Sequence, residues 1–412
     1  MRLPFFLAWR LSFDSSGGRL NSRPAVRVAQ IGVAVGILVM LLAVGITEGF
    51  KNEIREKISG FMLHMRVQGL RSSLSKDGVL WDEALDSVIR KGAPQTVRIQ
   101  RYSEKTGVMK TEGAFQGILL KGVGQEYDLD FYRSYLVEGE IPAFTDSLVT
   151  SKAVISRSLA DKMGLGLGDK ADFYFMDDEV RIRRLEIAGL FQTHFSLFDD
   201  RYVLTDLRTV SRLGLKKDGR VDGLEIAIDD FSHLDEAGVS LGSALETYHP
   251  DGQTLLVQTV RDANTAMFAW LDILDMNILI ILVLMILISG FTMVSGVWII
   301  LLERMPMIGT LKSMGARAGL LFRTFLVFGG LMVLKGVFWG NVVFFLFSIL
   351  QNRFRLLRLD AESYYMDHVP VDIGFSSWLL VNVLSVVLLL LFVLIPLGFI
   401  QRIRPSQTMR QD

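Results

Sequence analysis

Residue types that can perform catalysis occur in this chain, but few of them have a catalytic spacing. Ser73 and Lys76 match a Ser-x-x-Lys pattern, yet this pattern is short and lies in a polar stretch. The histidines are scattered and form no His-Glu-x-x-His motif; they are His64, His194, His233, His249 and His368. Adjacent acids at residues 177–178, 199–200 and 229–230 fall at expected turns, where solvated aspartates are common. We therefore expect no catalytic residue and no metal site.

Nucleotide and nucleic acid binding are also disfavoured by the sequence. A Gly-x-x-x-x-Gly-Lys-Ser/Thr motif is missing, so we expect this chain to hold no nucleotide cofactor in a P-loop. The net charge is zero, which gives no general attraction to nucleic acid. The chain contains no cysteine, which fits an exported domain but is weak evidence for one.

The apolar residues are concentrated in four runs. Half of the residues are hydrophobic and the mean hydropathy is +0.36, which is high for a soluble protein of 412 residues. The runs cover residues 28–46, 278–302, 320–350 and 378–400. Each is long enough to cross a hydrocarbon core of about 30 Å as a helix. We read the first run as an uncleaved anchor, because it lacks a small-x-small cleavage pattern.

These runs predict an α-helical membrane protein with four transmembrane helices and a large α+β extracytoplasmic domain inserted between helices 1 and 2. The predicted segments are an N-terminal arm (1–27), helix 1 (28–47), the extracytoplasmic domain with stalk helices (48–275), helix 2 (276–302), a short cytoplasmic helix (303–319), helix 3 (320–350), a loop (351–377), helix 4 (378–400) and a tail (401–412).

Cationic residues orient the predicted spans. The arm, the loop between spans two and three, and the tail all lie on one side of a four-span protein, and each is rich in arginine or lysine. The positive-inside rule makes that side cytoplasmic, so both termini are expected inside. The loop between spans three and four also carries arginines, followed by acids, and is a partial exception. The insert then lies outside, in the periplasm of a bacterial cell.

The stretch ERMPMIGTLKSMGA (residues 303–316) predicts a short amphipathic helix between spans two and three. Pro306 suits a first helical turn, and Gly315 or Gly319 can end the helix. Met307, Ile308, Leu311 and Met314 fall on one face. From the residues alone, two readings stay open: a helix lying in lipid headgroups, or a coupling helix that docks on a cytoplasmic motor.

The same stretch resembles the E-R-x-x-x-I-G-x-L-K/R-x-x-G-A signature of FtsX-like or MacB-type ABC transporter permeases. Four further segments resemble the family in order: FFLAWRL (5–11), VGITEGFKNEIREKISGF (44–61), SLADKMGLGLGDKADFY (158–174) and YYMDHVPVDI (364–373). The last of these, with IRPSQTMR (403–410), resembles the lipoprotein-releasing (LolC/LolE-type) branch. The resemblance covers nearly the whole chain and favours the coupling reading.

The resemblance implies partners and a transport role. In this family the signature contacts an ATP-binding subunit, here a LolD-like cytoplasmic ABC ATPase that would bind ATP and Mg. The implied contact residues are Glu303, Arg304, Met307, Ile308, Leu311, Lys312, Met314 and Gly315. The branch implies a second permease copy or paralogue, a lipoprotein substrate and a LolA-like periplasmic chaperone. Its members are multi-pass proteins of the bacterial inner membrane.

The resemblance also implies a cavity for acyl chains between the first and second spans of two permeases. The matching positions are Met40, Val44, Phe50, Met267, Leu271, Leu274 and Ile278. Wrapping an acyl chain gains about 0.8 kcal/mol per buried methylene, so ATP-driven closure must expel it. From the residues alone, apolar stalk positions are more often plain core.

The insert combines strand and helix patterns. We expect strands near 115–120, 149–155, 171–175, 180–187, 202–204, 224–228 and 255–257, and helices near 81–91, 156–163, 206–213 and 234–248. Ser158 and Asp206 are predicted N-caps, and residues 176–179 a hairpin turn. Branch members that recruit the chaperone carry a longer, proline-containing hook where this chain has FYFMDDEVRIRR (173–184). Chaperone docking is therefore an open question.

Small and charged residues stand out in the spans. Gly32 and Gly36, and Gly336 and Gly340, have the Gly-x-x-x-Gly spacing, which predicts close helix packing. Lys335 lies near the middle of span three, where an unpaired ammonium is costly. Either the span is placed so that Lys335 reaches the interface, which we favour, or the side chain faces a wet cavity.

The first functional hypothesis is the permease subunit of a transporter that extracts lipoproteins from the inner membrane. The alternatives are a MacB-like exporter of other cargo and an FtsX-like scaffold that transmits ATPase motion to a periplasmic hydrolase. The sequence leaves open the cargo and whether the two permeases are identical.

Overall fold

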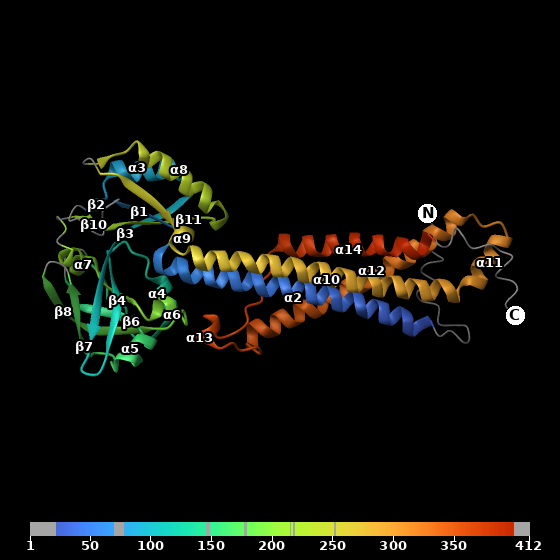
Figure 1. Cartoon of the computed structure of the whole chain (residues 1–412), viewed down its shortest axis with the longest axis horizontal. Coiled ribbons are helices and arrows are strands. Elements are labelled where there is room, and N and C mark those ends of the chain that lie inside the picture. Colours follow the sequence, from blue (N-terminus) through green and yellow to red (C-terminus); the bar gives the residue numbers. More distant parts are fainter. Residues whose placement is uncertain are drawn as a thin grey trace. The chain divides into compact units, whose positions relative to one another are not determined.

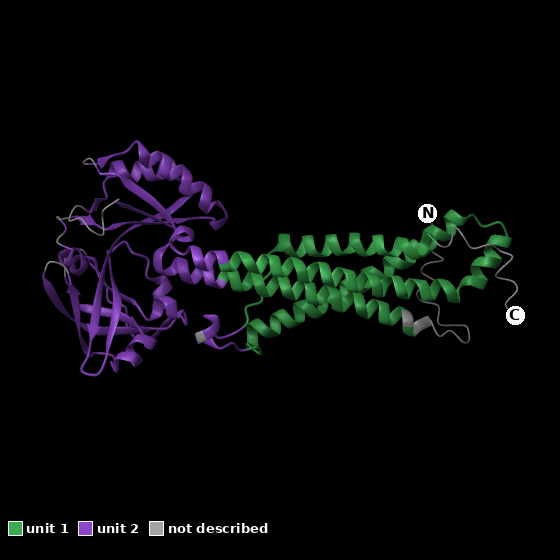
Figure 2. Cartoon of the chain, viewed as in Figure 1, with its two compact units in different colours: residues 1–52, 270–357, 369–412 green, residues 53–269, 358–368 purple. Residues whose placement is uncertain are grey.

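The computed structural model describes residues 22–69, 78–145, 149–176, 179–214, 216, 219–250 and 253–398 (Figure 1). The chain divides into two compact units, each described here by itself (Figure 2). Unit 1 contains residues 1–52, 270–357 and 369–412, and unit 2 contains residues 53–269 and 358–368.

Unit 1 is built from long apolar helices. In the described part of the chain, four helices are long and apolar enough to cross a membrane: α2 (Ser22–Met62), α10 (Thr265–Glu303), α12 (Ala318–Phe354) and α14 (Phe375–Leu397). Helix α2 has 41 residues, or about 60 Å at 1.5 Å per residue. This is roughly twice the thickness of a hydrocarbon core. Helices α2 and α10 are therefore longer than a membrane span requires, and their ends at residues 53–62 and 265–269 belong to unit 2.

Glycines bring the helices of unit 1 into close contact. A Cβ atom added at Gly36 would lie 1.9 Å from Ser289 Oγ of α10, and one at Gly340 would lie 2.8 Å from Ile37 Cβ of α2. Gly32 and Gly336 meet Thr292 and Val33 as closely, at 2.6 Å. Both Gly-x-x-x-Gly pairs thus pack α2 against its neighbours, which confirms their predicted packing role.

The core of unit 1 is apolar, with few polar side chains inside it. Met40, Val297, Phe325 and Leu389 contribute to it from the four long helices. Asn341 of α12 donates to Asn382 Oδ1 of α14 at 2.7 Å and accepts from Trp378 Nε1 at 2.7 Å, so these amides satisfy one another. Lys335 lies in the middle of α12, is partly buried and has an interaction partner, so it is not an isolated charge.

Unit 2 is an α+β unit built on one large sheet. In the described residues, the sheet has ten strands in the order β12-β1-β11-β3-β4-β9-β6-β8-β5, and β7 pairs with both β3 and β8. The strands are β1 (Met65–Gly69), β3 (Thr96–Lys110), β4 (Phe115–Val123), β5 (Leu136–Gly139), β6 (Lys152–Ser156), β7 (Lys170–Met176), β8 (Val180–Phe191), β9 (Tyr202–Asp206), β11 (Gly223–Ile228) and β12 (Leu255–Thr259). A separate pair joins β2 (Val79–Leu80) to β10 (Arg220–Val221).

Strand β3 holds this sheet together. Its first half pairs with β11 and its second half with β4, both antiparallel. Its last residues also pair with β7. Beyond β4, the strands β9, β6 and β8 include parallel pairs, and an apolar core with Phe173, Phe175, Ile155 and Leu120 forms against them.

Helices cover the sheet of unit 2. Helices α3 (Glu83–Gly92) and α8 (Leu234–Glu246) pack on one another, and α8 packs on β12 (Figure 1). Helix α7 (Leu207–Leu213) packs on β3 and β4, and α5 (Arg157–Met163) packs beside β6. Shorter helices are α4 (Asp130–Ser134), α6 (Ser196–Asp199), α9 (Val260–Ala263), α13 (Ala361–Tyr364) and the 3-10 turn Phe231–His233.

Local predictions in unit 2 were largely, but not completely, correct. Asp206 caps α7 by accepting from the Thr209 backbone N–H at 2.8 Å, as predicted. The predicted cap Ser158 is wrong: Ser156 accepts from Leu159 N at 2.9 Å and begins the helix two residues earlier. Strands β1, β2, β3, β5 and β10 were not predicted. In β3 this is because buried polar residues, Gln100 and Ser103 among them, break the apolar alternation.

Candidate functional site

The side chains predicted to line an acyl-chain cavity are mostly packed within this chain. Met40, Val44 and Leu271 are buried, and Phe50, Met267, Leu274 and Ile278 are partly buried. Ser385 Oγ of α14 donates to Met40 Sδ at 3.8 Å, so Met40 contacts a neighbouring helix of its own chain. Met267 belongs to unit 2, whereas the other six belong to unit 1.

Helix α10 instead presents a wide apolar surface that no described part of unit 1 covers. Met276, Ile280, Val283 and Leu287 recur at helical spacing and are all exposed, with Met276 61% exposed. Neighbouring exposed residues are Ile273, Leu279, Leu284, Ile288 and Phe291. A surface of this kind needs lipid, acyl chains or another subunit against it. We call it the α10 face.

Charged residues join α2 to its neighbours beside this face. Lys51 Nζ of α2 donates to both carboxylate oxygens of Asp275 of α10, at 2.8 and 2.7 Å. The Phe50 and Trp270 rings meet edge to face with centroids 5.5 Å apart. Glu48 accepts from the Gly374 backbone N–H at 3.0 Å and from the Ser377 hydroxyl, so its carboxylate caps α14.

The YYMDHVPVDI segment contacts helix α2 in each unit. In unit 1, Asp372 N donates to the Gly45 carbonyl at 3.0 Å, and a Cβ on Gly49 would lie 3.0 Å from Pro370 O. Glycine at this position therefore lets the segment pass close to the helix. In unit 2, Lys57 Nζ donates to Tyr365 O at 2.8 Å.

The predicted coupling helix is α11 (Met305–Ser313), and its ends follow the sequence prediction. Pro306 lies in the first turn. Gly315 has a φ of +91°, and the backbone N–H groups of Gly315 and Ala316 donate to Lys312 O and Leu311 O at 3.1 and 2.9 Å. These two bonds form a Schellman cap, which requires glycine at the left-handed position.

Not all of the predicted coupling residues are accessible. Ile308 is buried in the core of unit 1, and Met307 and Leu311 pack against that core. Arg304 and Lys312 are partly buried. Glu303, Met314 and Gly315 are exposed, and Met314 is 78% exposed. The apolar face of α11 therefore points into its own chain, whereas Glu303 and the C-terminal turn with Met314 and Gly315 are exposed in the described part of the chain.

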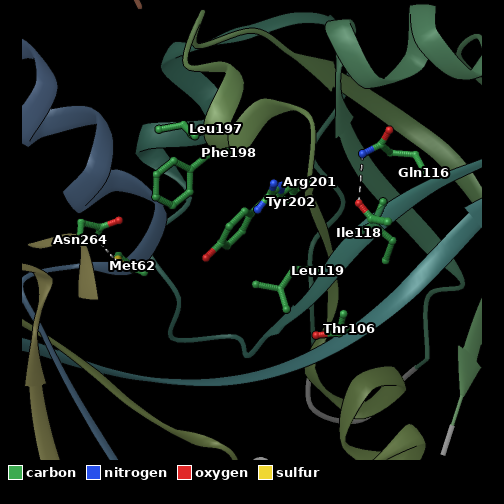
Figure 3. A pocket seen from close by; sticks show the side chains of 11 residues that line it. Met62, Thr106, Gln116, Ile118, Leu119, Leu197, Phe198, Arg201, Tyr202 and Asn264 are labelled. Atoms are coloured by element: carbon green, nitrogen blue, oxygen red, sulfur yellow. Dashed lines mark hydrogen bonds between the residues drawn. The ribbon is translucent and has the colours of Figure 1, made fainter. Parts of the chain in front are cut away.

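Unit 2 contains a cavity of about 610 Å³ at the ends of the two longest helices (Figure 3). Met62, the last residue of α2, and Asn264, which precedes α10, line one side of it. Asn264 Nδ2 donates to Met62 Sδ at 3.2 Å and joins these two ends. Leu197, Phe198 and Tyr202 line another side. We call this space the edge cavity, because the strand β4 forms its remaining wall.

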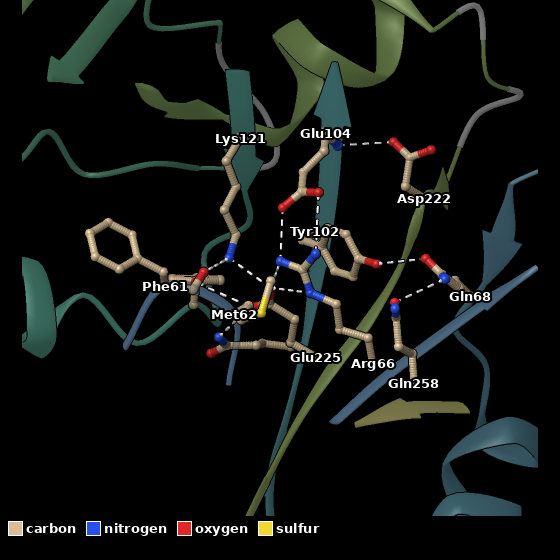
Figure 4. Close-up of polar contacts among 12 residues, drawn as sticks. Phe61, Met62, Arg66, Gln68, Tyr102, Glu104, Lys121, Asp222, Glu225 and Gln258 are labelled. Atoms are coloured by element: carbon tan, nitrogen blue, oxygen red, sulfur yellow. Dashed lines mark hydrogen bonds and ion pairs between the residues drawn. The ribbon is translucent and has the colours of Figure 1, made fainter. Parts of the chain in front are cut away.

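A buried ion cluster anchors the end of helix α2 in unit 2 (Figure 4). Glu225 Oε1 of β11 accepts from Lys121 Nζ at 2.7 Å and from the Arg66 guanidinium at 2.7 and 3.1 Å. Arg66 also makes two bonds to Glu104, and Lys121 donates to the Phe61 carbonyl at 2.5 Å. Lys121 thus satisfies a terminal carbonyl of α2.

The cluster balances two cations against two carboxylates. Burial alone would raise the pKa of Glu225, but Lys121 and Arg66 outweigh it and hold that pKa below its usual value. Burial lowers the pKa of Lys121 despite Glu225. The four residues come from four strands, so no local pattern in the sequence revealed them. One indication of the cluster was present in the sequence, namely charged residues within otherwise apolar strands.

The acid pairs have different environments. Asp229 and Asp230 are exposed, as expected of turn residues. Asp199 is buried, which contradicts the expectation of a solvated turn acid. Asp199 ends the short helix α6, and its carboxylate accepts from Thr193 Oγ1 at 2.6 Å and from Thr193 N at 3.2 Å. Burial raises the pKa of Asp199 to about 6.

The predicted hairpin at residues 173–184 is present. Strands β7 and β8 pair antiparallel from Lys170 and Glu186 up to Met176 and Val180, which confirms the hairpin. Several predicted features lie outside the described residues: Ser73, Lys76, Asp177 and Asp178, the segment 5–11 and the tail segment 403–410.

Comparison with known proteins agrees with this arrangement of apolar helices and an α+β unit. Residues 28–243 match the MacB-like periplasmic core domain, and residues 279–405 match the FtsX-like permease C-terminal domain. The chain therefore belongs to the FtsX-like and MacB-like family of ABC transporter permeases, and within it to the LolC/LolE type.

Relatives match over nearly their whole length. The lipoprotein-releasing system transmembrane protein LolC of Xylella fastidiosa (strain 9a5c) is 21% identical over 401 residues, covering 93% of this chain and 92% of that protein. LolE of Haemophilus influenzae is 19% identical and covers 99% of both chains. The periplasmic region of MacB from Actinobacillus actinomycetemcomitans has a TM-score of 0.32 at 15% identity, over 49% of this chain and 91% of that one. The protein is a multi-pass inner-membrane permease subunit.

Proposed function

We propose that this permease extracts lipoproteins from the outer leaflet of the inner membrane, driven by ATP hydrolysis on a partner subunit. Relatives of the chain carry lipoprotein release in their names, at about 21% identity. The structural observation that carries the proposal is the α10 face, an uncovered apolar surface that runs along a membrane-length helix from Ile273 to Phe291. Acyl chains fit such a surface, because burying their methylene groups against apolar side chains is favourable.

In the proposed complex, the α10 faces of two permeases enclose the acyl chains. Residues such as Met276 and Ile280 line this space first, because they are already exposed. The predicted residues Met40, Val44 and Leu271 lie deeper, so acyl chains reach them only if α2 and α10 separate from their neighbours. Both termini and α11 lie on the cytoplasmic side in this proposal, following the positive-inside rule.

The exposed end of α11 supports docking of a cytoplasmic ATPase. Met314 and Gly315 follow the helix, and Glu303 precedes it. The buried Ile308 ties this helix to the core of unit 1, so a push on α11 moves the core rather than a loose loop. ATP and Mg then belong to the partner. A second permease, identical or paralogous, and a periplasmic chaperone complete the proposed system.

The proposal is tested by purification of the full chain from membranes together with what it binds. A co-purified P-loop ATPase with a triacylated lipoprotein supports lipoprotein extraction. A peptidoglycan hydrolase in place of the lipoprotein would favour the scaffold function, and a different cargo the MacB-like exporter function.

A matched pair of variants locates the cargo surface. Ile280→Asp places a charge on the α10 face, and Phe338→Asp places one on an exposed position of α12. We expect Ile280→Asp to abolish lipoprotein co-purification while the ATPase remains bound, and Phe338→Asp to retain both. Equal retention of lipoprotein by the two variants would contradict the role of the α10 face.

A further inference from the structure

We propose that the edge cavity of unit 2 binds the extended polypeptide linker that follows the acylated cysteine of a lipoprotein, as an added strand on the free edge of β4. This inference rests on the proposed function and adds a peptide subsite to it. Four observations carry it: an open strand edge, an apolar cavity beside that edge, an uncompensated cation at its mouth, and its place at the ends of α2 and α10.

The first observation concerns hydrogen bonding along β4. Strand β4 pairs with β3 along its whole length, from Phe115 to Val123. Its other side pairs with β9 only from Leu119 onward, where Leu119 N donates to the Arg201 carbonyl at 2.8 Å. Backbone groups alternate between the two sides of a strand, so the N–H and C=O of Gly117 point the same way as those of Leu119.

Gly117 is therefore the open position of this edge. In the described residues, no strand pairs with Gly117 on that side. Its carbonyl accepts only a long bond of 3.4 Å from the adjacent Gln116 side chain, which an incoming peptide can displace. A Cβ on Gly117 would meet nothing within 4 Å, so there is space for an approaching backbone. Unpaired edges of this kind accept extended peptides by strand addition.

The second and third observations define which peptide fits. Leu197, Phe198 and Tyr202 provide an apolar surface beside β4 (Figure 3). Arg201 is exposed at the same cavity, and no described carboxylate pairs with its guanidinium. The site thus favours an extended segment with an apolar side chain for the cavity and an acidic side chain near Arg201.

The fourth observation points to the lipoprotein as the source of the peptide. Met62 and Asn264 place the cavity at the points where α2 ends and α10 begins. Both helices also carry residues to which the proposed function assigns the acyl chains, such as Phe50 of α2 and Met276 of α10. The residues directly after the acylated cysteine follow the acyl chains in the lipoprotein, so they are the peptide that we assign to the cavity.

The experiment uses the full permease with its ATPase and partner permease in membranes. Because the chain has no native cysteine, single cysteines give disulfides without background from this chain. Leu197→Cys reports on the edge cavity, and Val239→Cys, on an exposed position of α8 in the same unit, is the matched control. The probe is a triacylated lipoprotein with one added cysteine at successive linker positions. We expect cross-links from Leu197→Cys at alternate linker positions, and none from Val239→Cys.

Two further variants test the mode of binding. Gly117→Pro removes the outward N–H that a peptide would use. This N–H does not face β3, so the change removes no hydrogen bond between β3 and β4, and proline is tolerated at such edge positions. Arg201→Glu reverses the charge and leaves the Arg201 carbonyl in place. Each variant is expected to slow lipoprotein release about tenfold, the loss expected from one or two hydrogen bonds or one charge contact. If the acidic residue of the lipoprotein linker is replaced by lysine, the Arg201→Glu permease should again release this lipoprotein at the normal rate.

The outcomes separate this inference from the proposed function. One combination of results would overturn the peptide subsite alone. In it, lipoprotein still co-purifies, Gly117→Pro and Arg201→Glu both release lipoprotein at the wild-type rate, and the linker forms no cross-link to Leu197→Cys. Cross-links from Leu197→Cys to the second permease or to a chaperone would also overturn it, because the cavity would then have a different occupant. Failure of lipoprotein co-purification would overturn the proposed function itself.

Discussion

The ammonium group of Lys51 lies 2.7 Å from the Asp275 carboxylate and thereby joins helix α2 to helix α10 at the end of their apolar segments. The Lys51 side chain is only 10% exposed, whereas that of Asp275 is 60% exposed. The exposed Asp275 carboxylate therefore neutralises the nearly buried Lys51 ammonium. Removing Asp275 would leave a nearly buried cation without a counter-charge.

We predict that Asp275→Asn destabilises the folded chain by about 1 kcal/mol, because the bond is charge-assisted but partly screened. The measurement is thermal unfolding of the purified chain in detergent. Asp272→Asn, an exposed position on the same helix, is the control and should have almost no effect. Indistinguishable losses for the two variants would show that the Lys51 pair contributes nothing.

The buried ion cluster of unit 2 gives a larger effect. Glu225→Gln leaves Lys121 without a carboxylate in the interior, and we expect a loss of about 3–5 kcal/mol. The double variant Glu225→Gln with Lys121→Met should lose less stability than the sum of the losses of the two single variants, because it no longer contains an unpaired buried cation. Hydrogen exchange of the β1 and β11 amides measures both effects.

The exposed pair of Asp172 and Arg184 on the β7–β8 hairpin provides the contrast for this cluster. Asp172→Asn should leave the exchange of the same amides unchanged, since both side chains are hydrated. Additive losses for Glu225→Gln and Lys121→Met would argue against a coupled cluster.

Helix packing in unit 1 depends on missing side chains. Gly36→Ala forces a methyl group toward Ser289 Oγ and is expected to cost about 1–3 kcal/mol. Combining it with Ser289→Gly should recover part of this loss, because the space opens on the facing helix. The melting temperature in detergent provides the readout.

Gly319→Ala is a useful comparison, because a Cβ there meets nothing within 4 Å. Alanine is also the better helix former, so this variant should be at least as stable as the parent. If Gly319→Ala were as damaging as Gly36→Ala, close packing would not explain the role of Gly36.

The buried carboxyl of Asp199 makes the stability of unit 2 pH-dependent. Its pKa is raised to about 6, above the ordinary 3.8, so the folded state holds a proton that the unfolded state releases between these values. The contribution to stability is therefore fully present below pH 4 and lost as the pH rises through 6, by about 3 kcal/mol. Asp199→Asn should remove this loss, so the unfolding free energy of the variant should rise relative to that of the parent as the pH increases from 4 to 7.

The corresponding measurement is the unfolding free energy of parent and variant across this pH range. Glu112→Gln, at an exposed position, controls for general charge effects. A constant difference between parent and Asp199→Asn at all pH values would rule out the raised pKa.

Much of the fold could be predicted from the sequence because the signals are local. Apolar runs of membrane length identified the long helices, Pro306 marked the start of α11, and Gly315 was one of the two glycines expected to end it. The hairpin of β7 and β8 and the cap at Asp206 followed from alternation and turn chemistry. Strand β3 escaped prediction because its polar residues are buried by partners that lie far away in the chain.

The candidate site was predictable only in part. The coupling signature and the apolar stalks could be recognised as motifs. The sequence did not show which of their faces are exposed in the folded chain. Ile308 and Met40 look like any exposed apolar position of an amphipathic or membrane helix, yet both are buried by other helices of the same chain. The open edge at Gly117 has no sequence signature, because it depends on where β9 begins to pair.

The sequence by itself determined which segments can enter a membrane, where α11 begins, and the family to which the chain is similar, because each depends on residues close together in the chain. The tertiary structure alone decided which apolar side chains remain uncovered and which charges meet, as in Lys51 with Asp275 and Lys121 with Glu225. Burial and ion pairing depend on distances between residues far apart in sequence, and chain folding sets those distances.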